Sequence, residues 1–434
     1  MSPIAIARVV FAAAAALTLA VQTDQPASGW RFALGRSGES LHAAARDMPA
    51  AGVEVSLPHR ALHPNAAMWY ARRLDLPANA SIAVEADDGA QLFVDGVQWA
   101  QERRVFFPPV PVGAGSHAIV VRVINNAMQG GLRRVTVLGQ RGQYPVPSLP
   151  RPAAGFDAVE SAAFQSRMPA GGAPCDFTLW ADSQSSWETF ATIVAGMGQR
   201  PHHFSAGIGD LVSDGSDPSA WTRLVETLAP LAARTPIVPI VGNHDYDGFY
   251  DDLASRWYGR LFERDATWMA WSCGPARFAA IDLNREFPIG ISPNSAQYAW
   301  LQQEVRSRAW RDAKWRVLLV HQPPYSRSWS GYDGDEAVRT IVRELVARHG
   351  LQLVVSGHSH AYEHLVRDIG GRPLHVLVTG GAGGELENPV SPAVLEPDRV
   401  ILAHHFIRGR ADRTALAVEA VDRDGQVLDR WALR

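Results

Sequence analysis

Five short polar segments, each placed directly after an apolar and strand-like run, constrain the fold of the second half of this chain. They are Ala181–Gln184, Gly209-Asp210, Gly242–Asp245, Val320-His321 and Gly357–His360. Helix-compatible stretches separate most of the runs, at Ser186–Gly198, Pro218–Ala233, Asn294–Trp310 and Asp335–His349. Alternating strands and helices build sheets that are covered by helices. Because ligand sites in α/β sheets gather at the carboxyl ends of strands, the pattern predicts an α/β fold with one site built from all five segments.

The side chains in these segments are suited to metal ions. Oxygen atoms, which suit hard cations, come from Asp182, Asp210 and Asn243. Imidazole nitrogens, which suit Zn, Fe, Mn or Ni, come from His321, His358 and His360. Mixed sets of this kind can hold two ions roughly 3.5–4 Å apart. The segments therefore predict a two-metal centre.

The order and wording of these motifs resemble the calcineurin-like metallophosphoesterases, and within them the purple acid phosphatases. The resemblance runs from about Asp176 to Gly384 and includes Gly357–Glu363 and Thr379–Gly383. It implies a four-layer αββα sandwich that hydrolyses phosphate esters of small molecules, with a metal-bound hydroxide as the nucleophile. Phosphomonoesters are the first expectation and phosphodiesters the alternative, because one sequence does not reveal the shape of a pocket.

The resemblance also assigns a role to each matching residue. Asp210 would bridge both metals and take part in catalysis. The first metal would be held by Asp182 and His360, and the second by Asn243, His321 and His358. His244 would contact the substrate together with Asn243, as general acid for the leaving group or as a phosphate donor. The expected cofactors are two divalent or trivalent ions, either Zn, Mn or Fe.

Three departures from the family pattern carry their own expectations. Ser213 stands where purple acid phosphatases have the tyrosine that binds ferric iron, which predicts a colourless protein without a ferric requirement. Gln184 stands where the wider superfamily often has histidine, and its carbonyl could bind a metal or only a metal-bound water. Ser330-Gly331 replaces a histidine pair, so Arg327 or Tyr325 is the candidate for phosphate contact, Arg offering a two-pronged donor.

The first part of the chain has a different pattern. We expect an all-β sandwich over residues 28–142, without helices, from strand-like runs at Met68–Leu76, Ser81–Ala86, Gln91–Val94, His117–Asn125 and Arg133–Leu138. The segments Trp69–Arg73 and Phe93–Gly96 resemble the galactose-binding-like jelly-roll domains of many glycosidases. Trp69 or Trp99 could therefore stack on carbohydrate, but the favoured interpretation is that these aromatic residues fill a core.

The remaining segments concern export and organisation. Arg8 precedes the apolar run Val9–Val21, which predicts a signal peptide over residues 1–22, with a retained anchor as the alternative. No other segment is long and apolar enough to span a bilayer, so we expect an exported protein, periplasmic or secreted. A Pro-rich linker is expected over residues 143–174, before a phosphoesterase domain over residues 175–434. Cys175 and Cys273 are expected to be unpaired buried thiols, a disulfide being the alternative.

Other functions and simpler residue roles compete with this interpretation. A net charge of −3 with scattered Arg residues argues against a nucleic-acid partner. Taken singly, Asp182 or Asp210 would more often be a helix N-cap, and five motifs in one order reverse that preference. An inactive carbohydrate-binding protein is the competing class. His364 is expected either near the metal ligands or at the surface, and Asp214 or Asp245 could orient His244.

Overall fold

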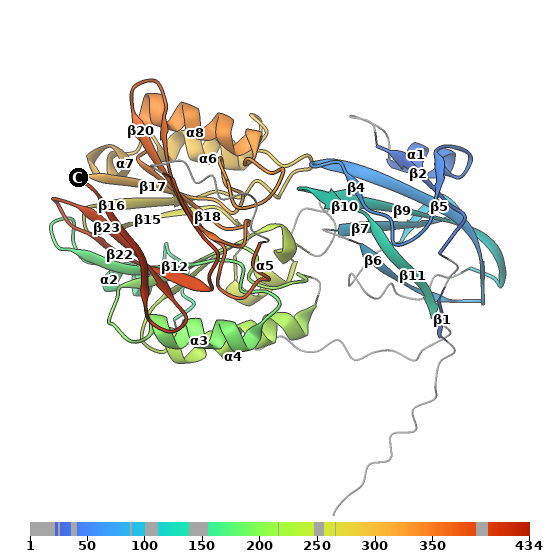
Figure 1. The fold of residues 1–434 in the computed structure, drawn as a ribbon, viewed down its shortest axis with the longest axis horizontal. Coiled ribbons are helices and arrows are strands. Elements are labelled where there is room, and N and C mark those ends of the chain that lie inside the picture. Colours follow the sequence, from blue (N-terminus) through green and yellow to red (C-terminus); the bar gives the residue numbers. More distant parts are fainter. Residues whose placement is uncertain are drawn as a thin grey trace, which may run out of the picture.

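The computed structural model describes residues 22–24, 27–35, 41–86, 89–99, 112–138, 155–215, 217–246, 256–264, 266–387 and 398–434. Within these ranges the chain forms two β-rich parts, which lie side by side in Figure 1. The N-terminal part is coloured blue to cyan and the C-terminal part green to red. Residues 1–21 of the expected signal peptide and residues 143–154 of the expected linker lie outside the described residues.

The N-terminal part is a sandwich of two antiparallel sheets. The larger sheet has the order β3 (Val53–Val55), β2 (Trp30–Leu34), β5 (Ala66–Leu76), β9 (Gly115–Asn125), β7 (Gly89–Val94) and β8 (Val97–Trp99). The smaller sheet has the order β1 (Gln22–Asp24), β11 (Leu132–Leu138) and β6 (Ser81–Ala86), and a separate pair joins β4 (Ala61–Leu62) to β10 (Gln129–Gly130). Branched aliphatic side chains from both sheets fill one core between them. The expected strands are therefore confirmed.

Two features of the N-terminal part differ from expectation. A short helix, α1 (Leu41–Asp47), and a 3-10 turn, η1 (Met48–Ala50), follow β2 where no helix was expected. Ala45 and Met48 from this segment pack on Trp69 and Phe93 across the outer face of the larger sheet. Trp69 is only 2% exposed, so the favoured interpretation of this residue as part of a core is confirmed, and the alternative of a carbohydrate platform is excluded. The side chain of Trp99 lies outside the described residues.

The C-terminal part contains two sheets that stack face to face. The six-stranded sheet has the order β14 (Ile237–Ile240), β13 (Phe204–Ile208), β12 (Cys175–Trp180), β22 (His405–Ala411), β23 (Leu416–Asp422) and β24 (Val427–Leu433). The seven-stranded sheet has the order β15 (Met269–Cys273), β16 (Ala276–Ala280), β17 (Trp315–Leu319), β18 (Leu353–Ser356), β20 (Pro373–Thr379), β19 (Tyr362–Asp368) and β21 (Arg399–Ile401). β12 to β14 run parallel, as do β16, β17, β18 and β20.

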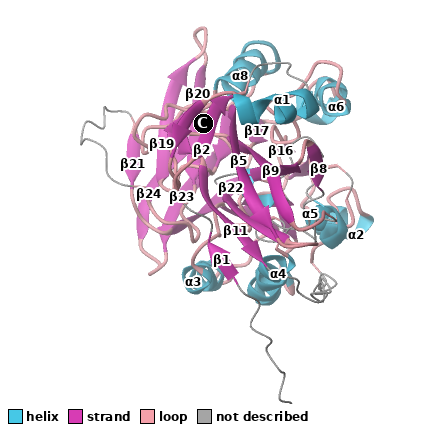
Figure 2. Cartoon of the chain, turned by 90° about the vertical axis from the view of Figure 1, so that its right-hand side faces the viewer, coloured by secondary structure: helices cyan, strands magenta, loops and turns pink. Residues whose placement is uncertain are grey.

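Helices cover the outer face of each sheet. On the six-stranded sheet these are α3 (Trp187–Met197), α4 (Pro218–Ala232) and α5 (Arg256–Phe262), and on the seven-stranded sheet α6 (Ala296–Glu304), α7 (Arg308–Asp312) and α8 (Glu336–His349). Figure 2 shows the strands between α3 and α4 on one side and α6 and α8 on the other. The short α2 (Ala162–Arg167) places Phe164 in the core between the sheets. The expected four-layer αββα sandwich is confirmed.

Helix ends follow the local capping chemistry. Ser295 accepts a hydrogen bond from the backbone N–H of Tyr298 and caps α6, but the expected single helix over 294–310 is divided. Ser307 caps a new helix, α7, through the backbone N–H of Trp310. The cap of α4 is Asp217, whose carboxylate accepts a hydrogen bond from the backbone N–H of Ser219.

A disulfide joins Cys175 to Cys273, with the two Cα atoms 5.5 Å apart. The expectation of unpaired thiols was therefore wrong. Cys175 begins β12 in one sheet and Cys273 ends β15 in the other, and both side chains point into the core between the sheets. The bond thus ties the two sheets together across 98 residues of sequence. No helix in the described ranges is long and apolar enough to span a membrane.

A stacked pair of histidines also connects the sheets. His364 on β19 lies 2.9 Å from His375 on β20, measured between Nε2 and Nδ1, and its ring stacks on Trp431 of β24 with centroids 3.9 Å apart. His364 is thus neither a metal-shell residue nor a surface residue, being 8% exposed. Burial, together with His375, lowers the pKa of His364 to about 4.

This pKa predicts a loss of stability in acid. An unfolded histidine binds a proton near pH 6.5, whereas folded His364 stays neutral down to about pH 4. The unfolded state therefore gains protons first as the pH falls through this window, which lowers the free energy of unfolding by about 3 kcal/mol. Urea unfolding at pH 7 and pH 4.5 measures the effect. His364→Phe keeps the stacking on Trp431 and should show a shallower pH dependence, while an unchanged dependence would contradict the assignment.

Candidate metal centre

The predicted metal ligands lie on loops at one edge of the two sheets. Asp182 follows β12, Asp210 follows β13 and the 3-10 turn η2 (Asn243–Asp245) follows β14. In the other sheet, His321 follows β17 and His358 follows β18. Because the strands within each group are parallel, their carboxyl ends lie together. The structure therefore brings side chains that are far apart in sequence into one cluster.

Asp210, His321 and His358 form the centre of this cluster. One ligand atom from each lies within 4.8 Å of the other two, and Nε2 of His321 is 3.2 Å from Oδ1 of Asp210. All three side chains are buried. Nε2 of both His321 and His358 has no hydrogen-bond partner within the described part of the chain. Buried nitrogen atoms without partners are costly, and a bound metal ion would satisfy both, so the residues fit a metal centre.

Hydrogen bonds fix the orientation of two imidazole rings. Nδ1 of His321 lies 2.9 Å from the carbonyl oxygen of Ile208, and Nδ1 of His360 lies 2.6 Å from that of Glu385. A carbonyl oxygen only accepts, so Nδ1 is protonated in each ring and Nε2 is the nitrogen that would bind a metal. Nε2 of His360 lies 3.5 Å from Oδ1 of Asp182, which places a second pair of ligands together.

Gln184 lies between the two groups of ligands. Its Nε2 is 3.4 Å from Oδ2 of Asp210 and 3.3 Å from Nε2 of His360. The amide is buried, and a half-turn about its last bond exchanges nitrogen for oxygen at this position. The Gln184 side chain is therefore close enough to the cluster to bind a metal as a neutral ligand, or to form a hydrogen bond with a metal-bound water.

A row of buried side-chain amides, which the sequence did not reveal, lies beside Asn243. Nε2 of Gln322 donates to Oδ1 of Asn284 at 2.6 Å and lies 3.5 Å from Oδ1 of Asn243. All three amides are buried. Gln322 directly follows His321 in sequence, and that adjacency was the available signal. The row fixes the amide of Asn243 beside the cluster.

Charge is distributed unequally among the central residues. Burial acts to raise the pKa of Asp210, but His321 and His244 outweigh it and hold the pKa below its ordinary value. Burial acts to lower the pKa of His321, but Asp210 outweighs it and raises the pKa to about 10. Burial and the neighbouring His321 lower the pKa of His358 well below its ordinary value. His358 is thus held neutral, which is the form that binds metals.

The backbone is strained at three of the predicted ligands. Asp182, Asp210 and His358 have φ angles of +58°, +49° and +69°. Non-glycine residues rarely occupy this left-handed region, and such residues gather at functional sites. The sequence carries no direct signal of this strain.

The glycines before the ligands make room for ligand atoms. A Cβ on Gly242 would lie 2.3 Å from Oδ1 of Asp210, and one on Gly357 would lie 2.4 Å from Oδ2 of Asp182. Both distances are too short for any real contact. Space for the two carboxylates therefore requires glycine at both positions.

Replacing Gly357 with Ala should therefore weaken metal binding. The added methyl group displaces the Asp182 carboxylate, and we expect affinity for the first metal to fall about 10-fold or more, as for lost support of a ligand. Titration with Zn or Mn followed by calorimetry measures the change. Gly290→Ala is the matched control, since the nearest atom to its Cβ would be 3.9 Å away. Equal metal affinity in the two variants would contradict the steric argument.

His244 lies at the exposed side of the cluster. Its backbone N–H donates to Oδ1 of Asp210 at 2.9 Å, and its ring Nε2 is 4.0 Å from Oδ2 of the same residue. Its Nδ1 lies 3.2 Å from the carbonyl oxygen of Ser213. The side chain is 26% exposed, so a ligand in solution could reach it. The two oxygens of Asp245 accept from the backbone of Val212 and Gly242, and in this way hold two ligand loops together.

The two candidates for phosphate contact have other neighbours. The Arg327 guanidinium lies 3.8 Å from the Asp398 carboxylate. Tyr325 lies beneath the guanidinium groups of Arg339 and Arg367, at 4.9 and 5.6 Å from its ring centroid. The same segment instead brings Trp329 and Tyr332 against His358, and sequence reasoning missed both of these aromatic residues.

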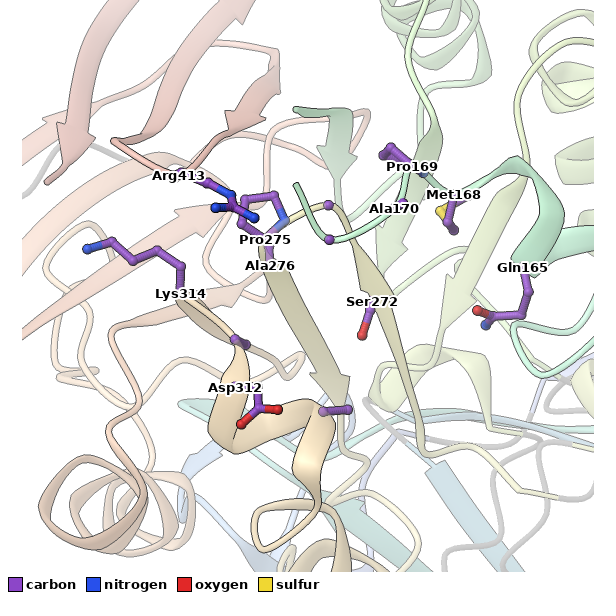
Figure 3. A pocket seen from close by; sticks show the side chains of 14 residues that line it. Gln165, Met168, Pro169, Ala170, Ser272, Pro275, Ala276, Asp312, Lys314 and Arg413 are labelled. Carbon is purple, nitrogen blue, oxygen red and sulfur yellow. The ribbon is translucent and has the colours of Figure 1, made fainter. Parts of the chain in front are cut away.

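A separate cavity of about 680 Å³ lies at the other end of the sandwich. Its lining includes Ser272, Ala276 and Lys314, close to the amino ends of β16 and β17 (Figure 3). The predicted metal ligands follow the carboxyl ends of the strands, so this cavity is separate from the predicted metal centre.

Comparison with known proteins agrees with this geometry. Residues 177–362 match the family model described as Calcineurin-like phosphoesterase. Purple acid phosphatase 23 of Arabidopsis thaliana is 27% identical over 180 residues, which cover 39% of this chain and 38% of that relative. Purple acid phosphatase 22 of the same plant is 23% identical over 250 residues, which cover 53% of this chain and 56% of that relative.

A solved structure shares the fold. Purple acid phosphatase PPD1 from seeds of yellow lupin (Lupinus luteus) superposes with a TM-score of 0.51 at 14% sequence identity, over 88% of this chain and 76% of that one. Residues 177–362 thus form a calcineurin-like phosphoesterase domain that is related to the purple acid phosphatases. The chain spans 38% and 56% of the length of the two curated relatives.

Proposed function

We propose that this protein is a metal-dependent phosphoesterase that prefers phosphomonoesters of small molecules. The observation that carries the proposal is the buried cluster of Asp210, His321 and His358, in which two imidazole nitrogens have no partner in the described residues. The phosphoesterase domain over residues 177–362 supports the same reaction class. Preference for monoesters rests on the likeness to purple acid phosphatases.

The proposed centre holds two metal ions. Asp210 would hold both ions, since its two carboxylate oxygens face different neighbours: Oδ1 faces His321, and Oδ2 faces Gln184. The ligands of the first ion are Asp182, His360 and the amide of Gln184. The ligands of the second ion are Asn243, His321 and His358. Such a pair of ions supplies charge that polarises a phosphoryl oxygen and makes a nucleophile available near neutral pH.

His244 is the residue proposed to contact the substrate and protonate the leaving group. Because Nδ1 faces the Ser213 carbonyl, the proton that can be transferred is the one on Nε2. The backbone N–H of His244 donates to Asp210, so the position of its ring is coupled to the bridging carboxylate. Asn243 would orient the phosphate from the neighbouring position.

The proposed metals are divalent ions such as Zn or Mn. One relative is named Fe(3+)-Zn(2+) purple acid phosphatase 12 of Arabidopsis thaliana, with 32% identity over 71 residues, or 16% of this chain and 15% of that relative. Ser213 replaces the tyrosine that binds ferric iron in purple acid phosphatases, so no ferric iron is proposed here.

Export from the cytoplasm is part of the proposal. The apolar run Val9–Val21 after Arg8 has the composition of a signal peptide. The disulfide between Cys175 and Cys273 supports this placement, because disulfides persist mainly in oxidising compartments.

Hydrolysis of p-nitrophenyl phosphate and bis-p-nitrophenyl phosphate tests the proposal. The purified protein would be loaded separately with Zn, Mn and Fe, and Asp210→Asn would be the control. Faster, metal-dependent turnover of the monoester is expected, with loss of turnover in the variant. Faster turnover of the diester would assign the protein to the phosphodiesterases of the same superfamily. No turnover, in a folded protein that binds no metal, would contradict the proposed function.

A further inference from the structure

Two aromatic side chains lie against one of the predicted metal ligands. The ring of Trp329 is 5.4 Å from that of His358, and the ring of Tyr332 is 5.5 Å from it, measured between centroids. The two aromatic rings are themselves 5.2 Å apart. Both residues are partly exposed, although the hydroxyl group of Tyr332 is itself buried.

The segment that carries these rings is firmly anchored. Glu363 is fully buried and accepts hydrogen bonds from the hydroxyl groups of Ser326 and Ser328 and from the backbone N–H of Arg327. The hydroxyl of Ser326 also lies 2.9 Å from that of Ser359, which stands between two predicted metal ligands. The aromatic pair is therefore held at a fixed position relative to the metal centre.

The N-terminal sandwich supports the same segment from the other side. A Cβ on Gly331, between the two aromatic residues, would lie 3.4 Å from the methyl group of Met128. Met128 stands between β9 and β10, and its carbonyl accepts from the Asn125 amide at 3.1 Å. A second contact joins the parts nearby, where the backbone N–H of Ile289 donates to Oδ1 of Asn65 at 3.1 Å.

We propose that Trp329 and Tyr332 form an aromatic wall that binds a planar aromatic group on the phosphate ester, and that Met128 of the N-terminal sandwich holds this wall in place. The inference rests on the proposed function, since it takes the phosphate to be bound at the metal centre. A phosphate bound at the metal centre would lie close to these rings, because both are beside the predicted ligand His358, and Trp offers a large apolar face on which a planar group stacks. Trp329 and Tyr332 are thus specificity-determining residues, and Met128 is a positioning residue.

The test compares two substrates in one enzyme. Naphthyl phosphate carries a planar aromatic group, whereas ethyl phosphate does not. In Trp329→Ala we expect kcat/KM for naphthyl phosphate to fall about 10-fold, and kcat/KM for ethyl phosphate to change less than about 2-fold. Trp329→Phe, which retains an aromatic face, should keep most of the preference. An equal loss with both substrates, or no loss with either, would overturn the proposal.

The role of Met128 is tested by measuring separately how its replacement changes kcat and KM. Met128→Ala should raise KM for naphthyl phosphate roughly 3-fold. It should leave kcat unchanged, because only the position of the aromatic wall is affected. Val97→Ala in the same sandwich is the control, since Val97 is 56% exposed. A fall in kcat for both substrates would show a general structural role and reject the positioning role.

Binding of phosphonates separates this inference from the proposed function. Phenylphosphonate and methylphosphonate are not hydrolysed, so their dissociation constants can be measured whether or not the protein turns over any ester. We expect the wild type to prefer phenylphosphonate and Trp329→Ala to lose that preference. If turnover is absent but this difference remains, the aromatic wall stands and the proposed reaction fails. If the two proteins bind both phosphonates alike, the wall is rejected.

Discussion

Asp210→Asn should lower kcat/KM for p-nitrophenyl phosphate by at least about 1,000-fold, a loss of roughly 4 kcal/mol in transition-state stabilisation. The physical reason is that both oxygens of this carboxylate are in use. Oδ1 lies 3.2 Å from Nε2 of His321 and accepts from the backbone of His244 at 2.9 Å, while Oδ2 faces Gln184 at 3.4 Å. An amide provides one oxygen and no charge, so it cannot bridge two cations as a carboxylate does.

Kinetics and metal analysis together measure this prediction. The variant should hold fewer metal ions per chain than the wild type, and adding excess metal should not restore its activity. Asp312→Asn is a suitable control, because Asp312 is exposed and pairs only with Arg308 at 3.0 Å among the described residues. A variant that kept two ions and most of its activity would rule out Asp210 as the bridging ligand.

Replacing both cysteines with Ala should lower the free energy of unfolding by about 4 kcal/mol. The bond between Cys175 and Cys273 closes a loop of 98 residues, and loops of that length restrict the unfolded chain strongly. It also joins β12 to β15, which belong to different sheets. For a domain of this size the loss corresponds to a fall in Tm of about 10 °C.

Thermal unfolding with and without a reductant measures this effect. Reduction should lower the Tm of the wild type and leave the Tm of the cysteine-free variant unchanged. Activity at 25 °C should be retained, because Cys175 begins β12 whereas Asp182 follows the other end of that strand. Equal Tm values for the oxidised wild type and the variant would contradict a stabilising role for the disulfide.

The sequence predicts the layers of the fold because strand-like runs and helix-compatible stretches are both easy to recognise. Apolar runs alternate with helix-compatible stretches in the C-terminal part, and the strands and helices follow that order. Short elements were missed, including α1, since a helix of seven residues gives little periodic signal and depends on packing against Trp69 and Phe93. The division between α6 and α7 depends on one capping serine, Ser307.

The part of the candidate site that depends on the types of residue present was predictable from the sequence. Asp, Asn and His at strand ends pointed to the metal cluster, and the structure brings Asp182, Asp210, His321, His358 and His360 together. Geometry that depends on distant segments was not predictable. The disulfide joins residues 98 apart, and no local pattern indicates that their side chains meet.

The contacts around the aromatic pair, including those between the two parts of the chain, could not be predicted from the sequence either. Trp329 and Tyr332 carry no motif, and their position beside His358 follows from the anchoring by Glu363. Met128 comes near Gly331, which lies between the two aromatic residues, only because the N-terminal sandwich packs against loops of the C-terminal part. The burial of Trp69 was expected from the sequence, but the segment that covers it, α1 with η1, was not.

The number of metal ions per chain tests the central claim most directly. The purified wild-type protein would be stripped with a chelator, dialysed against Zn or Mn, and analysed by inductively coupled plasma mass spectrometry beside Asp210→Asn. The buried cluster of carboxylate and imidazole ligands predicts two ions per wild-type chain and fewer in the variant. A folded wild-type protein that holds one ion or none after loading would contradict the dinuclear centre and the function proposed from it.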